Sequence, residues 1–167
     1  LAGATLPYGV TRLLAGLVFS LGLILVIVGG AELFTGNTLM SIAYTNRKIS
    51  FGDLMRNWGI VYLGNLVGSI STAIVMFISK QYTFSGGVVG VAALNIANSK
   101  VNLEPLQAIA LGIMCNALVC LAVWLCFSAR STRDKILALI PTITDFVACG
   151  FEHSVANLYF IPIAMMI

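Results

Sequence analysis

Charged residues are scarce in this sequence. They make up 9% of its 167 residues, whereas about a quarter of the residues of a soluble domain are charged. Hydrophobic residues make up 59%, and the mean hydropathy is +1.01. This composition excludes a soluble globular domain. The apolar runs reach roughly 20 residues, the length of a membrane-spanning helix, and therefore indicate an all-α integral membrane protein rather than an outer-membrane barrel.

Residues that bind metals or form catalytic sets are also scarce. The chain has one histidine, His153, and four cysteines, none of them in a CxxC motif or at metal-ligand spacing from the histidine. We therefore expect no metal, no cofactor and no enzymatic activity, and we interpret the cysteines as small buried apolar residues. Nucleic acid is excluded as a partner, because the aromatic residues lie among aliphatic residues rather than among lysines and arginines.

The sequence has no initiator methionine and stops at Ile167, within an apolar run. A cleavable signal peptide is a poor interpretation of its start, because the first apolar run is too long and apolar segments continue to the last residue. We therefore expect transmembrane elements to be missing at both ends.

Four apolar segments predict the membrane-spanning elements of a single transmembrane pore domain over residues 1–167. The second and third predict straight helices, and the first and last predict helices with a break. In chain order they are residues 12–44, 57–79, 106–128 and 136–167. In the second segment, Gly64 and Gly68 form a GxxxG pattern that predicts close helix packing. A polar connection, residues 80–104, follows it.

The first segment requires a break because of its length. Arg12 and Arg47 bracket a stretch whose only charged residue is Glu32, and a continuous helix through it would be ~50 Å long, against a hydrocarbon core of ~30 Å. Gly29 and Gly30 begin a polar interruption of this stretch. A broken helix is tolerated in a membrane only where protein or a water-filled cavity satisfies the freed backbone groups, so the break predicts a cavity.

A second polar cluster repeats the first at a constant offset of 120 residues. The two clusters share a glycine, a glutamate and an asparagine, which are Gly30, Glu32 and Asn37 in the first and Gly150, Glu152 and Asn157 in the second. The basic loops indicate that the first broken segment runs inward and the second outward. The sequence therefore predicts an inverted repeat whose two discontinuous helices meet near the membrane midplane.

Basic residues are distributed unequally among the connections. Loops 45–56 and 129–135 contain six lysines and arginines, against three on the opposite face, which are Arg12, Lys80 and Lys100. The positive-inside rule places both loops in the cytoplasm of a multi-pass inner-membrane protein, with Lys100 on the outer side.

Polar residues in the breaks are candidates for chemistry. We interpret Glu32 and Glu152 as structural acceptors for the N–H groups freed at the breaks; the alternative is a cation site in a cation channel. His153 lies beside Glu152, and an imidazole titrates near neutral pH, which favours a pore role over that of a neutral core histidine. Thr35 offers a hydroxyl group to the same permeant.

Four strings of residues resemble the formate/nitrite transporter family. They are Gly30-Ala-Glu-Leu-Phe-Thr35, Asn57-Trp58 with Gly64-Asn-Leu-Val-Gly68, Asn116-Ala-Leu-Val-Cys-Leu-Ala-Val-Trp124, and Gly150-Phe-Glu-His-Ser-Val-Ala-Asn157. The resemblance runs in register from end to end and is greatest to the hydrosulfide-channel branch. It implies an aquaporin-like fold of six spans in two inverted halves, assembled as a homopentamer with one pore per protomer. This chain would then cover spans two to five.

The resemblance also implies roles for particular side chains. The family's pore constrictions match Phe19, Leu23, Leu33, Phe34, Val119 and Phe146. Its central histidine matches His153, its pore threonine matches Thr35, and its lysine near the pore matches Lys100. Asp145 departs from the family, in which an apolar or small residue is expected. Ordinary core packing or lipid contact is the alternative for the apolar residues, and only the resemblance favours the pore.

The function implied by the resemblance is transport of small monovalent weak-acid anions, with hydrosulfide favoured and formate or nitrite also candidates. In this hypothesis Lys100 and half-helix N-termini attract the anion, the apolar constrictions remove its water, and His153 couples anion and proton movement. The alternatives are a cation channel based on the two glutamates and an aquaporin-type neutral-solute channel. The second has little support, because the sequence contains no Asn-Pro-Ala turn.

Overall fold

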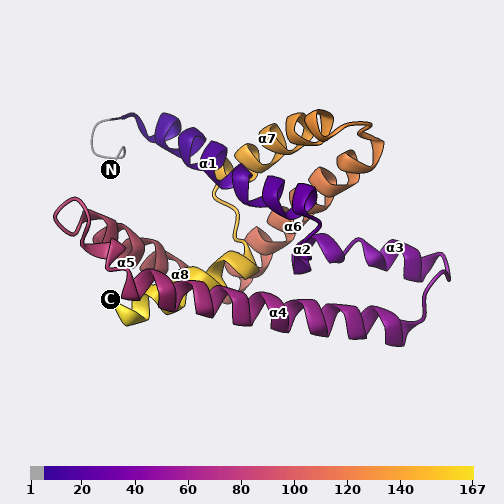
Figure 1. The fold of residues 1–167 in the computed structure, drawn as a ribbon, viewed down its shortest axis with the longest axis horizontal. Coiled ribbons are helices and arrows are strands. Elements are labelled where there is room, and N and C mark those ends of the chain that lie inside the picture. Colours follow the sequence, from indigo (N-terminus) through magenta and orange to yellow (C-terminus); the bar gives the residue numbers. More distant parts are fainter. Residues whose placement is uncertain (1–5) are drawn as a thin grey trace.

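Helices form the regular structure of residues 6–167, which are the residues that the computed structural model describes (Figure 1). In chain order they are α1 (Tyr8–Gly29), α2 (Phe34–Asn37), α3 (Met40–Thr45), α4 (Phe51–Ile78), the short 3₁₀ helix η2 (Gln81–Thr83), α5 (Val88–Val101), α6 (Pro105–Ser128), α7 (Thr132–Cys149) and α8 (Ser154–Met166). The helices α1, α4 and α6 are long and apolar enough to cross a membrane, and α7 and α8 are so only as a pair, which is bent by 57° at the break. The chain is therefore an all-α membrane protein, as its composition predicts.

Two helices begin earlier than the apolar segments predict. α4 begins at Phe51 and α7 at Thr132, so the two basic loops are shorter than expected. Each helix is preceded by a capping box, in which a serine side chain accepts the N–H of an aspartate and the aspartate accepts the N–H of the serine. The pairs are Ser50 with Asp53 and Ser131 with Asp134. A capping box satisfies two free N–H groups, so the helix starts at the cap rather than at the first apolar residue.

The polar connection over residues 80–104 is largely helical. η2 covers three of its residues, and α5 covers 14. α5 was not expected from the sequence, because its asparagines and glycine are poor helix formers. The helix packs against α8, and this tertiary contact compensates for the weak local preference.

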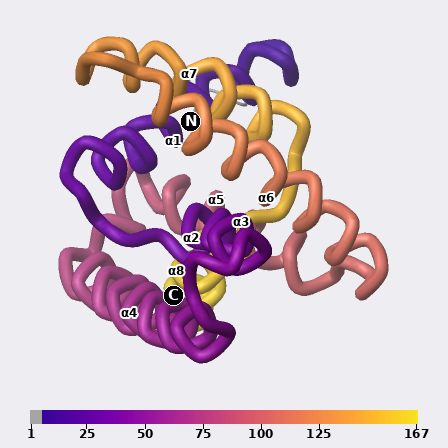
Figure 2. The backbone as a smooth tube through the Cα atoms, turned by 90° about the vertical axis from the view of Figure 1, so that its right-hand side faces the viewer, coloured from indigo at the N-terminus to yellow at the C-terminus, as the bar shows by residue number. Residues whose placement is uncertain are grey.

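The parts of the two broken segments that follow the breaks lie at the centre of the molecule. Figure 2 shows α2, α3 and α8 between α4 on one side and α1 with α7 on the other. α1 packs against α7, and α4 packs against α8, so each of these contacts joins the first half of the chain to the second. The buried core lies where α1, α6 and α7 meet, and its residues are Leu23, Cys115, Val119, Ala122, Cys126, Leu139, Ile143 and Phe146.

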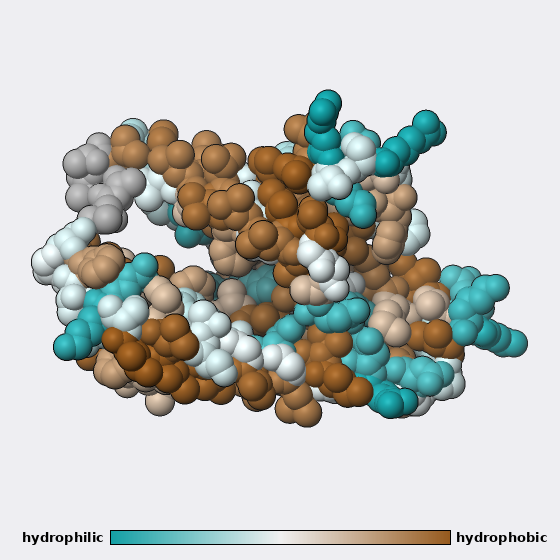
Figure 3. All heavy atoms as spheres, in the orientation of Figure 1, coloured by the Kyte–Doolittle hydropathy of each residue, from teal (hydrophilic) through white to brown (hydrophobic). Residues whose placement is uncertain are grey.

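Hydrophilic side chains gather at the ends of the helices. Figure 3 shows them on the right, over the α3–α4 turn and the α6–α7 turn; other hydrophilic groups lie at the left end and in the lower middle of this face, and apolar side chains cover much of the rest. These turns carry Arg47, Lys48 and Arg130, and Arg133 lies in the first turn of α7. An apolar band with basic residues at one end is the distribution expected of a helix bundle in a bilayer.

Gly16 brings α1 into backbone contact with α7. A Cβ atom at this position would lie 2.7 Å from the carbonyl oxygen of Thr144 and 2.8 Å from its Cα. Both atoms belong to the backbone, so α1 and α7 must separate to accept any side chain. We therefore expect Gly16→Ala to lower the free energy of unfolding by about 1–3 kcal/mol, measured as a lower melting temperature in detergent.

Gly22 provides the matched control in the same helix. A Cβ atom there would meet no atom within 4 Å. Gly22→Ala should keep or raise the melting temperature, because alanine is the better helix former. If Gly16→Ala melts at the temperature of Gly22→Ala, the close approach of α1 to α7 is not required for stability.

The predicted close packing at Gly64 and Gly68 is absent from residues 6–167. A Cβ atom at either glycine would meet no atom within 4 Å. Both glycines line an open groove of about 310 Å³ between α4 and α8, together with Asn65 and Tyr159. The GxxxG pattern therefore does not bring two helices of the described chain together.

Candidate functional site

The two helix breaks share one backbone geometry. Gly30 ends α1 and Gly150 ends α7, with φ of 71° and 79°, a region that glycine enters without strain. In the first break the N–H of residue 31 donates to the carbonyl of residue 26 (2.9 Å), and in the second the N–H of residue 151 donates to that of residue 146 (3.2 Å). These positions differ by the same 120 residues as the sequence repeat, and the structure confirms the repeat.

The second break is also held by a cation from the first half. The Arg12 side chain donates from Nε to the carbonyl oxygen of Ala148 at 3.4 Å. Its terminal nitrogen would lie 2.8 Å from a Cβ atom at Gly150. Because the carbonyls at the end of a helix carry partial negative charge, a guanidinium there stabilises the end of α7. Gly150 is therefore favoured by its positive φ, and a larger residue there would also displace the end of the Arg12 side chain.

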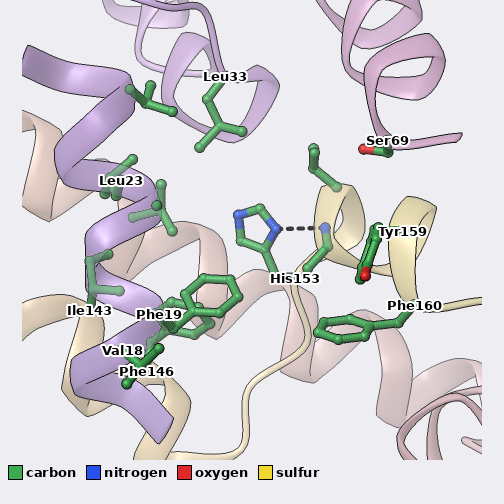
Figure 4. A pocket seen from close by; sticks show the side chains of 15 residues that line it. Val18, Phe19, Leu23, Leu33, Ser69, Ile143, Phe146, His153, Tyr159 and Phe160 are labelled. Carbon is green, nitrogen blue, oxygen red and sulfur yellow. Dashed lines mark hydrogen bonds between the residues drawn. The ribbon is translucent and has the colours of Figure 1, made fainter. Parts of the chain in front are cut away.

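One residue of each break is extended and lines a shared cavity. Leu33 has φ and ψ of −121° and 123°, and His153 has −105° and 110°. These residues occupy equivalent positions of the repeat, each directly before a helix. Figure 4 shows Leu33 and His153 on the border of one cavity, whose volume is about 440 Å³. The two breaks thus share one backbone conformation, but one places a leucine and the other a histidine at the same cavity.

The wall of this cavity is mostly apolar. Five of the six predicted constriction residues line it, namely Phe19, Leu23, Leu33, Val119 and Phe146. The rings of Phe19 and Phe146 pack edge to face with centroids 5.4 Å apart, and the imidazole centroid of His153 lies 6.3 Å and 6.0 Å from them. The imidazole is therefore a polar group in apolar surroundings, beside two aromatic rings (Figure 4).

Phe34, the sixth predicted constriction residue, lies elsewhere. Its ring packs against Trp58 and Tyr62 of α4, with centroids 6.2 Å and 5.3 Å apart. Phe34 borders a smaller cavity of about 130 Å³, which is also lined by Thr35 and Asn116. Phe34 therefore belongs to this smaller cavity and not to the cavity of about 440 Å³.

A hydrogen-bonded pair stands between these two cavities. Thr35 Oγ1 lies 3.2 Å from His153 Nε2, and both residues are buried. His153 Nδ1 accepts the N–H of Ala156 at 3.1 Å (Figure 4). Since Nδ1 is an acceptor, a neutral imidazole carries its hydrogen on Nε2 and donates it to Thr35. The hydroxyl hydrogen of Thr35 then remains available to a further acceptor.

The two glutamates do not bind the N–H groups freed at the breaks, contrary to the expectation from the sequence. Glu152 accepts hydrogen bonds from Lys100 Nζ at 2.7 Å and from Asn157 Nδ2 at 3.2 Å. Glu32 accepts one from the side chain of Asn37. The freed N–H groups find neutral acceptors instead: that of residue 34 donates to Asn65 Oδ1, and that of residue 156 donates to the imidazole.

Lys100 is part of an ion pair rather than of the cavity wall. It lies in the last turn of α5, and its side chain and that of Glu152 are 14% and 16% exposed. Its Nζ also lies 5.9 Å from the ring centroid of Phe160. The positive charge that we expected to attract an anion is therefore largely balanced within the protein.

Asp145, the departure from the family pattern, points away from the cavity. Its side chain is exposed, and the thiol of Cys149 lies 3.7 Å from its carboxylate. Successive residues of a helix point ~100° apart, so Phe146 can line the cavity while its neighbour does not.

Three residues of α4 that the sequence analysis gave no role in the site contact the first break. Asn65 binds the backbone of residues 32 and 34, Trp58 donates to the carbonyl of Asn37 at 3.0 Å, and Asn57 accepts from the side chain of Asn37 at 3.0 Å. The sequence feature that could have indicated these contacts is the position of the three polar side chains on one face of an otherwise apolar helix. Groups of three or more possible metal ligands are absent from the part of the chain that the structure describes.

Similar proteins share both sequence and fold with this chain. The "Formate channel FocA" of Escherichia coli (strain K12) is 43% identical over 163 residues, which cover 98% of this chain and 57% of that protein. The "Probable formate transporter" of Methanothermobacter thermautotrophicus is 37% identical over 181 residues, covering 100% of this chain and 66% of that protein. The chain thus spans less than two thirds of the length of these relatives.

Two solved structures resemble the fold closely. A "Pentameric formate channel with formate bound" superposes with a TM-score of 0.92 at 51% identity, covering 98% of this chain and 64% of that one. An "FNT family ion channel" superposes with a TM-score of 0.84 at 32% identity, covering 97% and 64%. The family model described as "Formate/nitrite transporter" matches residues 1–167. This chain belongs to the formate/nitrite transporter family.

Proposed function

We propose that this chain forms the centre of a membrane channel for small monovalent weak-acid anions, and that formate is the anion it conducts. The observation that carries the proposal is the Thr35–His153 pair, which places hydrogen-bond donors between two cavities in an apolar wall. The names of the relatives favour formate. Hydrosulfide, which the resemblance of the sequence favours, and nitrite are the other candidates.

The proposed mechanism begins with removal of water from the anion. Phe19 and Phe146 offer no hydrogen bonds, so an anion that passes them exchanges its hydration shell for the donors beyond. Those donors are His153 Nε2–H and the hydroxyl group of Thr35. A bare anion is costly in apolar surroundings, and two donors at the same point reduce that cost while leaving hydrated cations without a ligand.

The geometry also restricts how a proton accompanies the anion. A neutral imidazole cannot give up its Nε2 hydrogen without becoming an anion itself. A transferable proton must therefore first bind Nδ1, which accepts the N–H of Ala156. Protonation of Nδ1 therefore breaks the hydrogen bond from the N–H of Ala156, which caps α8. In this proposal the protonation of His153 is coupled to the first turn of α8, and the imidazolium can hold the anion or donate a proton to it.

We further propose that the protein is a homopentamer of the inner membrane in which this chain supplies spans two to five of six, with its broken segments at 12–44 and 136–167. The similarity to a pentameric channel supports the assembly. The basic residues in loops 45–56 and 129–135 support a cytoplasmic position for these loops. The ion pair of Glu152 with Lys100 weighs against a cation channel, because that carboxylate already has a cation.

The test is a measurement of current and flux in liposomes that contain the full-length protein. In asymmetric sodium formate gradients, the reversal potential should follow formate. In competition with hydrosulfide, nitrite and chloride, formate should permeate best among the four. A reversal potential that follows sodium would reject the anion channel, whereas a preference for hydrosulfide or nitrite would reject formate alone.

Phe146 provides a test of the cavity wall. It is 2% exposed and packs against Phe19 and His153. We expect Phe146→Ala to widen the proposed pore and to raise the single-channel conductance for formate, because an apolar barrier becomes shorter and wider. Gel filtration and the melting temperature report whether the variant still folds. If the flux of every tested anion falls in a folded variant, Phe146 is a packing residue rather than a constriction.

A further inference from the structure

A single amide side chain of α4 bridges the first break. Asn65 Oδ1 accepts the backbone N–H of Phe34 at 2.9 Å, and Asn65 Nδ2 donates to the backbone carbonyl of Glu32 at 3.0 Å. These two backbone groups lie on either side of Leu33. The amide therefore holds both peptide groups that determine the direction of the Leu33 side chain.

The bridge satisfies a requirement of the membrane. Backbone N–H and C=O groups freed at a helix break have no water to bind within a bilayer, and each costs several kcal/mol if left unpaired. Asn65 supplies an acceptor for the freed N–H group and a donor for the freed carbonyl group. Leu33 is held in an extended conformation by this pair of bonds rather than by a helix.

The same face of α4 also holds the far end of α2. Trp58 lies seven residues before Asn65, which is about two helical turns. Its indole N–H donates to the carbonyl of Asn37, the last residue of α2, at 3.0 Å. The short helix α2 is thus attached to α4 at both ends. The position of Leu33, which directly precedes α2, is determined by α4.

Leu33 lies where two cavities meet. It borders the cavity of about 440 Å³ described above and a second cavity of about 430 Å³, which lies toward α3 and α6. Leu23 and Val26 of α1 border both cavities as well. These three apolar side chains therefore separate the two spaces, and a small movement of Leu33 changes the opening between them.

The second break is held differently. At the position equivalent to Leu33, His153 accepts the N–H of Ala156 through its own ring. Within residues 6–167, no side chain bridges the backbone groups of Glu152 and Ser154 in the way that Asn65 bridges those of Glu32 and Phe34. The bridge is thus particular to the break that carries an apolar residue, which cannot cap its own helix.

We propose that Asn65 is a positioning residue that fixes Leu33 at the opening between the two large cavities, and that it thereby limits the size of the anion that passes. This inference rests on the proposed function as an anion channel. Asn65 acts through Leu33 and does not touch the anion, so its removal changes discrimination by size more than the affinity for one anion.

The test compares the permeability to acetate with that to formate in liposomes that contain the full-length protein. Asn65→Leu keeps the volume of the side chain and removes both hydrogen bonds. We expect it to raise the acetate-to-formate ratio roughly tenfold, the effect of losing two hydrogen bonds of ordinary strength. Asn98→Ala is the control, because Asn98 is an exposed amide on α5 that binds only Asn102 among the described residues; it should leave the ratio unchanged.

A double substitution tests whether Asn65 acts by positioning Leu33 or by stabilising the whole protein. Leu33→Ala removes the side chain that Asn65 is proposed to place, and it should raise the same ratio. Adding Asn65→Leu to Leu33→Ala should then have no further effect, because coupled residues are not additive. An unchanged ratio in the folded Asn65→Leu variant, or full additivity in the double variant, would overturn the inference.

A second variant and a second reference anion cover the cases in which Asn65→Leu does not assemble or formate is not the anion conducted. If Asn65→Leu does not assemble, Asn65→Gln keeps both polar groups but displaces them by one methylene, and it should shift the ratio in the same direction by less; no shift in the folded Gln variant would reject the inference. If the wild-type protein conducts hydrosulfide or nitrite rather than formate, the ratio is taken against that anion. In that case only the proposal that formate is the conducted anion is rejected, and the experiment still tests whether Asn65 positions Leu33.

Discussion

Replacing His153 by leucine should lower formate flux about 30- to 150-fold and remove its dependence on pH. The reason for the first effect is the loss of one hydrogen bond to a desolvated anion, worth about 2–3 kcal/mol. The second effect follows because the imidazole is the group proposed to carry a proton beside the anion. In the wild-type protein flux should rise as the pH falls, after subtraction of the leak of undissociated acid through protein-free liposomes.

His153→Asn separates the two roles of the imidazole. An asparagine can accept the N–H of Ala156 as a helix cap and can offer an amide N–H toward Thr35, but it does not titrate. We expect this variant to retain more flux than His153→Leu and to show no pH dependence. If His153→Leu conducts formate with the pH dependence of the wild type, His153 has no part in the mechanism.

Replacing Lys100 by methionine should destabilise the protein by about 3 kcal/mol, at the lower end of the range for a broken buried ion pair. The Glu152 side chain, which is 16% exposed in the ion pair, would lose its cation and keep Asn157 as a hydrogen-bond donor. The measurement is the melting temperature in detergent, together with the fraction of protein that remains oligomeric.

The double substitution Lys100→Met with Glu152→Gln should restore most of this stability, because it removes both charges. Glu32→Gln is the matched control in the first break. Glu32 is exposed and accepts a hydrogen bond from Asn37, and no cation lies within ion-pair distance of it in residues 6–167. Its replacement should change stability by less than about 1 kcal/mol. Equal melting temperatures for Lys100→Met and the wild type would show that the ion pair does not hold the second break.

The helix breaks could be predicted from the sequence because they depend on local chemistry. Gly30 and Gly150 adopt positive φ, and the spacing of the surrounding glutamates and asparagines repeats with them. The sequence placed Thr35 and His153 at the same permeant, but it could not predict that they bind each other directly, at 3.2 Å. Their contact joins residues 118 positions apart, and no local pattern determines such a distance.

The directions of individual side chains could not be predicted in the same way. Phe34 was expected among the constriction residues, as Leu33 was, but adjacent residues at the start of a helix point in different directions, and Phe34 packs against α4. Glu152 was expected to bind backbone N–H groups, but Lys100, 52 residues earlier, offers a stronger partner. Asn65 was interpreted only as the interior of a GxxxG pattern, because its bonds depend on how α4 crosses the first break.

The contact between α1 and α7 has a consequence for how the protein is made. Arg12 binds a carbonyl group 136 residues later in the chain, and Gly16 has no other partner as close as Thr144. At a synthesis rate of roughly 5–20 residues per second, α1 emerges from the ribosome on the order of ten seconds before α7. During that interval Arg12 and Gly16 lack the groups of α7 that they contact in the folded protein. Neither half of the repeat can therefore complete the cavity alone, and the pore centre forms only after most of the chain has been inserted.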